Sequence, residues 1–209
     1  MSEIIIPNAA FPSGMRITSA RVYDLYESIA ASKYPMQTEP DPQRKDLTPT
    51  AIKLAQSNPG EGHDNWLLGV RVAFDITMSA KMLVEAERYH FFDIVSSSSQ
   101  MHRIAKFDLD YAYIEYTDPG IVEIMKRLVD EYNINPTPEN YLRLLYSNPS
   151  GFLYTMRITT NYRQLKTIYR QRRTHRLPEW RDFTDWIQTL PHSDLITFID
   201  EPPSHTSDK

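Results

Sequence analysis

The feature that most constrains the fold is an alternating stretch, "NWLLGVRVAFDIT", at residues 65–77. Apolar side chains recur there at every second position, at Leu68, Val70, Val72, Phe74 and Ile76. Successive side chains of a β-strand point to opposite faces, so this spacing predicts a strand with one buried face. The fold must therefore contain a sheet whose apolar face is covered by other elements.

Most of the remaining patterns are helical. Amphipathic or capped segments predict helices at 20–31, 49–57, 79–92, 120–134, 137–146, 161–173 and 179–190. Residues 109–117 predict a second strand, and the stretch "SNPSGFLYTMRITT" before the helix at 161 is extended in character. Together these patterns predict an α+β fold in which helices pack on a small, mostly antiparallel sheet.

Length and composition indicate one domain. The chain has 209 residues, of which 41% are hydrophobic, and this is enough for a sizeable core. We expect a single domain over residues 1–199, with a polar, proline-containing loop at 33–49. Residues 200–209, "EPPSHTSDK" preceded by an aspartate, are expected to form a disordered tail.

Several classes of protein are not supported by the composition. The chain has no cysteine, which excludes disulfides, thiolate–zinc sites and thiol nucleophiles. None of the six histidines pairs with another at i, i+4, so no metal site is predicted. No apolar run approaches the roughly 20 residues that span a bilayer, and the N-terminus does not resemble a signal peptide. We therefore expect a cytoplasmic protein with no membrane partner.

Positive charge is concentrated in one segment. Residues 157–176 contain seven Lys or Arg and no Asp or Glu, although the whole chain carries a net charge of −4. A nucleic acid, a phosphorylated ligand and a solvated helix face are the three possible reasons. At 100° per residue, Arg163, Lys166, Arg170 and Arg173 share an arc of about 80°, and we expect this face to point outward.

The opposite face of the same helix carries Asn161, Leu165, Ile168 and Arg172. A buried arginine needs an anion or a full set of acceptors, so Arg172 predicts either a structural ion pair or a ligand site, unless the helix end frays. The outward face of 161–176 also permits a nucleic-acid-binding interpretation. The segment upstream is extended and lacks the helix and turn of a helix-turn-helix motif, however, and this interpretation is the least favoured of the three.

The segment "TTNYRQLKTIYRQRRTHRLPEW" resembles the C-terminal signature of flavin-dependent thymidylate synthases. In that family an N-x-R-S-L segment opens a helix, an arginine follows, and a tryptophan lies beyond. The matching residues are Asn161, Arg163, Leu165, Arg172 and Trp180. Upstream, a histidine that enters a strand and the motif R-H-R-x-x-S-x-N-E-x-S-x-R-Y correspond to His63 and to "AERYHFFDIVSSSSQM".

The sequence departs from this motif at most positions. Of its nine fixed positions, only Arg88 and Ser98 match. Gln100 stands where the family has its final arginine, and Arg103, one turn further on, could substitute for it. Glu85 replaces a glutamine that is usual in the family. The resemblance thus implies a retained scaffold with altered chemistry.

The resemblance implies binding of FAD by His63, Arg88 and Asn161. It implies a site for dUMP at Ser98, Gln100, Arg103 and Arg172. Members of the family methylate dUMP with methylenetetrahydrofolate and a hydride from a flavin reduced by NADPH. They are homotetramers whose sites form between subunits, and the arginine-rich helix is then an anion cradle.

Each implied site residue also has a simpler interpretation. Ser96–Ser99 can be a polar loop, His63 a loop histidine, and Arg88 a partner in a surface ion pair. The alternative to an active enzyme is a catalytically inactive homologue that keeps the fold as a nucleotide-binding or assembly protein. The third interpretation is a protein that binds nucleic acid through the basic helix.

Overall fold

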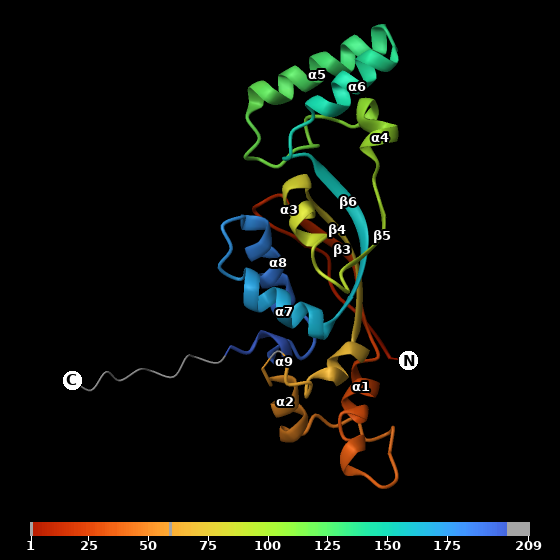
Figure 1. Ribbon diagram of the computed structural model, residues 1–209, viewed down its shortest axis with the longest axis vertical. Helices are drawn as coiled ribbons and strands as arrows, with labels where there is room; N and C mark the ends of the chain where they lie inside the picture. Colours follow the sequence, from red (N-terminus) through yellow and green to blue (C-terminus); the bar gives the residue numbers. More distant parts are fainter. Residues whose placement is uncertain (1, 59, 200–209) are drawn as a thin grey trace, which may run out of the picture.

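The computed structural model describes residues 2–58 and 60–199, and it contains a six-stranded antiparallel sheet (Figure 1). The strands are β1 (Glu3–Ile5), β2 (Ala9–Ala10), β3 (Arg16–Tyr23), β4 (Arg71–Ser79), β5 (Asp93–Ser97) and β6 (Leu153–Asn161). Their order is β1-β3-β4-β6-β5, and β2 pairs with β3 at one side. The predicted α+β fold with an antiparallel sheet is confirmed.

Helices cover one face of the sheet and extend beyond both ends. The α-helices are α1 (Leu25–Ala31), α2 (Pro49–Ala55), α3 (Ala80–Ala86), α4 (Gln100–Arg103), α5 (Pro119–Ile134), α6 (Pro138–Ser147), α7 (Tyr162–Arg172), α8 (Pro178–Gln188) and α9 (Asp194–Thr197). Short 3₁₀ helices are η1 (Tyr34–Met36), η2 (Asn65–Gly69) and η3 (Ile104–Lys106). In Figure 1, α3, α7 and α8 lie on the same side of the sheet, α5 and α6 at one end, and α1 and α2 at the other.

The central strand β4 confirms the alternation found in the sequence. Val72, Phe74 and Ile76 are buried, and Phe74 packs 4.8 Å from the ring of Trp186 in α8. The strand begins later than predicted, because residues 65–69 form η2, and Leu68 is 39% exposed. Burying one face of β4 against α8 therefore fixes the main core of the molecule.

A smaller apolar cluster lies between α5, α6 and the start of β6. It contains Ile104, Leu109, Ala112, Met125, Leu128, Leu144 and Phe152. The predicted helices at 120–134 and 137–146 are confirmed as α5 and α6, and those at 49–57, 161–173 and 179–190 as α2, α7 and α8. In α5, Met125 and Leu128 are buried, whereas Ile121 and Ile124 remain 40% and 48% exposed.

The prediction of a helix at 20–31 is wrong in its first half. β3 continues to Tyr23, and α1 begins only after Asp24, which has a φ of +58°. Ile17 and Val22 are buried in this strand, where β3 pairs with β4. Pairing and burial thus override a local pattern that is compatible with a helix.

Two predictions around β5 are also wrong. The helix expected at 79–92 ends at Ala86, and Phe91, with a φ of +59°, turns the chain into β5. Ser96 and Ser97, expected in a polar loop, lie in β5 and pair with β6. The edge of the sheet supplies the backbone hydrogen bonds that no sequence pattern indicates.

The strand predicted at 109–117 does not form. Its one ladder contact in the described residues is an isolated bridge between Tyr113 and Phe152. The predicted loop at 33–49 contains only η1 before α2 begins at Pro49. The predicted tail at 200–209 lies outside the described residues, and the single domain over 1–199 stays a prediction.

A close backbone approach joins the α5–α6 end to the sheet. A Cβ added to Gly151 would lie 2.0 Å from Oγ1 of Thr117 and 3.2 Å from Cγ2 of Ile114. The chain also hydrogen-bonds here, from the N–H of Ile114 to the carbonyl of Gly151 at 2.9 Å. Only glycine fits this position without displacing the segment that leads into α5.

We predict that Gly151→Ala lowers the stability of the protein by about 1–3 kcal/mol, as overpacking does. For a chain of this size, each kcal/mol corresponds to a shift in Tm of roughly 2–4 °C. Thermal unfolding measures this shift. The double variant Gly151→Ala/Thr117→Ala removes the clashing hydroxyl and should recover most of the loss, and an unchanged Tm in Gly151→Ala would contradict the packing described.

Candidate functional site

The basic helix α7 begins at the end of β6, where Asn161 caps it. The side-chain Oδ1 of Asn161 accepts a hydrogen bond from the backbone N–H of Gln164 at 2.9 Å, and Asn161 is 8% exposed. Leu165 and Ile168 are fully buried, so the predicted inward face of the helix is confirmed. The N-cap fixes both the direction of α7 and the position of its first turn.

Lys166 corrects the predicted outward face. We expected it to face solvent with Arg163, but it is 2% exposed. Its Nζ donates to the carbonyls of Ala55 and Ser57, both at 2.6 Å, and to Oδ2 of Asp64 at 2.8 Å. Three acceptors satisfy the ammonium group, and this makes its burial possible.

Asp64 also contacts a second cation on α7. Nε of Arg163 lies 3.0 Å from its Oδ1, an ion pair without hydrogen-bond geometry. Asp64 is itself 2% exposed and follows His63 directly in the chain. The cluster of Asp64, Arg163 and Lys166 therefore anchors the loop that bears His63 to the first half of α7.

The second half of α7 is anchored by Glu85 of α3. Oε2 of Glu85 accepts from Nη1 of Arg172 at 2.8 Å and from the indole N–H of Trp180 at 3.0 Å. His175 lies 3.4 Å from the same oxygen through its Nε2. The guanidinium of Arg172 thus forms a structural ion pair, one of the two interpretations of a buried arginine that the sequence allows.

Concave surfaces surround Asn161. One, of about 520 Å³, is floored by Ala73 and Thr159, which are cross-strand partners, and is bordered by Tyr23 and Phe91. Since Phe74 and Ile158, their neighbours along the strands, face the core, Ala73 and Thr159 point to the other side of the sheet. A smaller one, of about 180 Å³, runs along the first turns of α7 and shares Leu68, Phe91 and Asn161 with the first.

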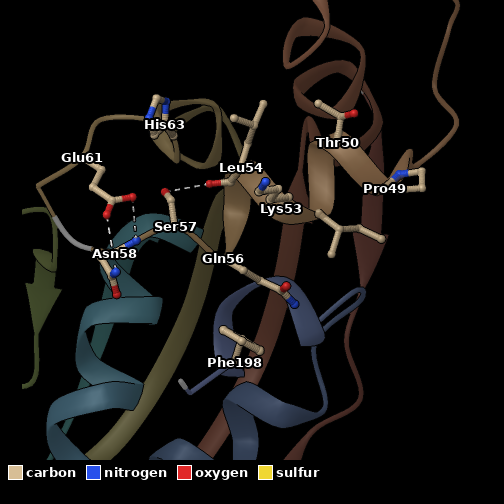
Figure 2. Close-up of a pocket in the computed structure, with 11 residues that line it drawn as sticks. Pro49, Thr50, Lys53, Leu54, Gln56, Ser57, Asn58, Glu61, His63 and Phe198 are labelled. Carbon is tan, nitrogen blue, oxygen red and sulfur yellow. Dashed lines mark hydrogen bonds between the residues drawn. The ribbon is translucent and has the colours of Figure 1, made fainter. Parts of the chain in front are cut away.

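His63 lies at the edge of two further cavities next to α2. The larger, of about 790 Å³, is shown in Figure 2, where His63 lies on the side opposite Phe198. The other, of about 620 Å³, is lined by Lys33, Met36 and Trp66 among others. Within the described residues, the exposed His63 has no ion pair and no side-chain hydrogen bond.

The remaining implied residues lie on two segments. Arg88 is exposed in the turn after α3. Phe91 of the same turn lines the cavities at Asn161, whereas Tyr89, next to Arg88, bonds to Gln171 and Arg172 at the other end of α7. In the described residues Arg88 takes part in no ion pair, including those that the sequence suggested with its neighbouring glutamates. The structure thus brings the turn that bears Arg88 to the same end of the sheet as Asn161.

Ser98, Gln100 and Arg103 lie toward the other end of β5. Ser98 exchanges backbone and side-chain bonds with Thr155: its N–H donates to the carbonyl of Thr155 at 2.9 Å, and its Oγ accepts from the N–H at 3.2 Å. Gln100 and Arg103 are the first and last residues of α4. Thr155 and Asn161 are six residues apart on β6, about 20 Å along a strand.

Sequence reasoning missed the residues that organise the site through tertiary contacts. The sequence patterns assign no role to Asp64, Tyr89 or Phe91, and they indicate Trp180 only as a match to the family signature. Within residues 2–58 and 60–199, no group of His, Cys, Asp or Glu could hold a metal ion. In the same residues no helix is long and apolar enough to cross a membrane.

We predict that Lys166→Ala destabilises the protein by about 3–5 kcal/mol, because it leaves the buried Asp64 carboxylate with only Arg163. The matched double variant Lys166→Met/Asp64→Asn removes both charges and should be less destabilised than Lys166→Ala. Thermal or urea unfolding provides the measurement. A Lys166→Ala variant as stable as the parent would show that the cluster does not anchor the loop.

Comparison with known proteins bears on the fold. No family model matches the sequence, and no curated protein matches it. Among solved structures, a flavin-dependent thymidylate synthase ThyX from Helicobacter pylori, complexed with FAD and dUMP, superposes with a TM-score of 0.63 at 16% identity. The match covers 84% of this chain and 94% of that chain.

A second structure of ThyX from Helicobacter pylori, also with FAD and dUMP, gives a TM-score of 0.63 at 15% identity. It covers 85% of this chain and 93% of that one. The resemblance found in the sequence is thereby confirmed at the level of the fold. The chain has the fold of the flavin-dependent thymidylate synthases.

Proposed function

We propose that the protein binds FAD and a deoxyuridylate-type nucleotide and transfers a one-carbon unit from methylenetetrahydrofolate to dUMP, with NADPH as reductant. The observation that carries this proposal is the position of Asn161. It lies where two cavities meet, beside the turn that bears Arg88, in a fold shared with an enzyme crystallised with FAD and dUMP.

The surroundings of Asn161 fit a flavin. The cavity of about 520 Å³ lies within the range of roughly 300–1,000 Å³ that is usual for small-molecule sites. Tyr23 and Phe91 offer aromatic surface to a ring system, and Arg88 offers a guanidinium for a pyrophosphate. When bound, FAD supplies the hydride that a methylation of this type requires.

The proposed nucleotide contacts are Ser98, Gln100 and Arg103. Because Oγ of Ser98 accepts from the N–H of Thr155, its own hydroxyl hydrogen is left to donate to a ligand oxygen. Arg103 is exposed at the end of α4 and can present its guanidinium fork to a phosphate. These residues would orient and bind the nucleotide, and none of them supplies a nucleophile.

The second candidate function is a non-catalytic homologue that keeps the fold for nucleotide binding or assembly. It is favoured by Arg172, which the resemblance assigns to the nucleotide but which pairs with Glu85 at 2.8 Å. The nucleic-acid interpretation gains less support. Arg163, Lys166 and Arg172 of the basic segment all have carboxylate partners within the molecule.

We predict that the purified protein incubated with FAD retains it through gel filtration and shows oxidised-flavin absorbance. Arg88→Ala should weaken FAD binding about 10- to 100-fold, the effect of one lost charge-assisted contact. Arg173→Ala is the matched control, since Arg173 is the exposed C-cap residue that follows α7. A colourless parent protein that releases no heat on titration with FAD would overturn the enzyme proposal.

The proposal also implies assembly. If sites form between subunits, as the resemblance implies, the protein should be a homotetramer of about four times 24.4 kDa. Light scattering at micromolar concentration measures this mass directly. A clean monomer that still binds FAD would separate cofactor binding from assembly and contradict composite sites.

A further inference from the structure

The carboxylate of Glu85 is the centre of a closed polar cluster between α3, α7 and α8. Its Oε2 lies within reach of three nitrogens: Nη1 of Arg172 at 2.8 Å, the indole nitrogen of Trp180 at 3.0 Å and Nε2 of His175 at 3.4 Å. A guanidinium, an indole N–H and an imidazole around one oxygen are the donors that would surround a bound anion. Here the anion is a side chain of the protein.

Arg172 is held on its other sides as well. Its Nε donates to the hydroxyl of Tyr89 at 2.7 Å, and that hydroxyl donates to Oε1 of Gln171 at 2.8 Å. The guanidinium carbon lies 4.7 Å from the ring of Trp180 and 5.4 Å from the ring of Tyr89. The two side chains of the ion pair are only 17% and 19% exposed. Arg172 is therefore fixed in orientation and largely withdrawn from solvent.

A phosphate that approached Arg172 would meet a neutralised guanidinium and a like-charged carboxylate. In a partly buried site these charges interact more strongly than in water. The repulsion between Glu85 and the phosphate therefore cancels most of the attraction between the phosphate and Arg172. Displacing Glu85 would also strand its carboxylate beside Trp180 without its cation. Either route makes a phosphate contact at Arg172 unfavourable.

We infer that Glu85 is a built-in counter-ion that excludes phosphate from Arg172. Arg172 is then a structural residue, and a phosphorylated ligand of this protein must have its phosphate bound elsewhere. This inference deepens the proposed function, since it states where the phosphate of the proposed nucleotide is not held. It also applies to any other phosphorylated ligand of the protein.

The test compares the parent with Glu85→Gln, which keeps the shape and one acceptor of the side chain but removes its charge. We expect Glu85→Gln to gain a dUMP-binding site that the parent lacks, in which the released cation of Arg172 holds the phosphate, so that titration shows added dUMP binding. Deoxyuridine, which lacks the phosphate, should gain nothing. The gain should vanish in the double variant Glu85→Gln/Arg172→Gln. A folded Glu85→Gln that binds dUMP no better than the parent would overturn the inference.

The single variant Arg172→Gln provides a second test of the inference, which can be carried out even if Glu85→Gln does not fold. It should lower Tm clearly, because Glu85 loses its cation, and change dUMP affinity by less than about twofold. A tenfold loss of dUMP affinity at an unchanged Tm would refute the counter-ion role.

Failure of the proposed function is recognised separately. If the parent binds neither FAD nor dUMP, the proposed function is wrong, and inorganic phosphate then serves as the probe. Phosphate should raise the Tm of Glu85→Gln more than that of the parent or of the double variant. Equal shifts in all three proteins would refute the inference.

Discussion

Two carboxylates from distant parts of the chain hold the basic helix α7 in place, and the rest of the site depends on this. Asp64 binds Lys166 and Arg163 near its start, and Glu85 binds Arg172 near its end. Because ion pairs of this kind are costly to break once they are buried, they fix where α7 lies relative to the loop of His63 and to α3. Three of the cations in the basic segment, Arg163, Lys166 and Arg172, thus have carboxylate partners within the molecule. These ion pairs join secondary-structure elements to one another instead of forming an open cationic surface.

Sequence patterns predicted the parts of the fold that depend on local periodicity. The alternation of β4 and the inward face of α7 at Leu165 and Ile168 arise from neighbouring residues, and the structure confirms both. The errors arise where a partner far along the chain determines the burial or the secondary structure of a residue. Lys166 is buried because Asp64 lies 102 residues earlier. The first half of 20–31 is extended because β4 pairs with it, and neither partner is visible from the local sequence.

The candidate site was less predictable than the fold, for a related reason. A core tolerates exchange among apolar residues as long as volume and pattern are kept, so a fold can persist at 16% identity. A binding site needs particular groups at particular distances, and it changes with a single residue. Glu85 illustrates this difference. In the sequence it is only a glutamate at a position where the family usually has glutamine. Its effect on Arg172 depends on the contact between α3 and α7, which the local sequence does not show.

The site residues that the resemblance implies are spread along β6. Asn161 lies at one end of β6, and Ser98 pairs with Thr155 toward the other, about 20 Å away along the strand. One chain can therefore bring both groups to one ligand only if that ligand extends along the sheet. Otherwise the two groups serve different ligands, or each is completed by residues of a second copy. In the last case, a ligand bound between copies stabilises the assembly by mass action, and the oligomeric state of the protein would itself depend on the ligand concentration.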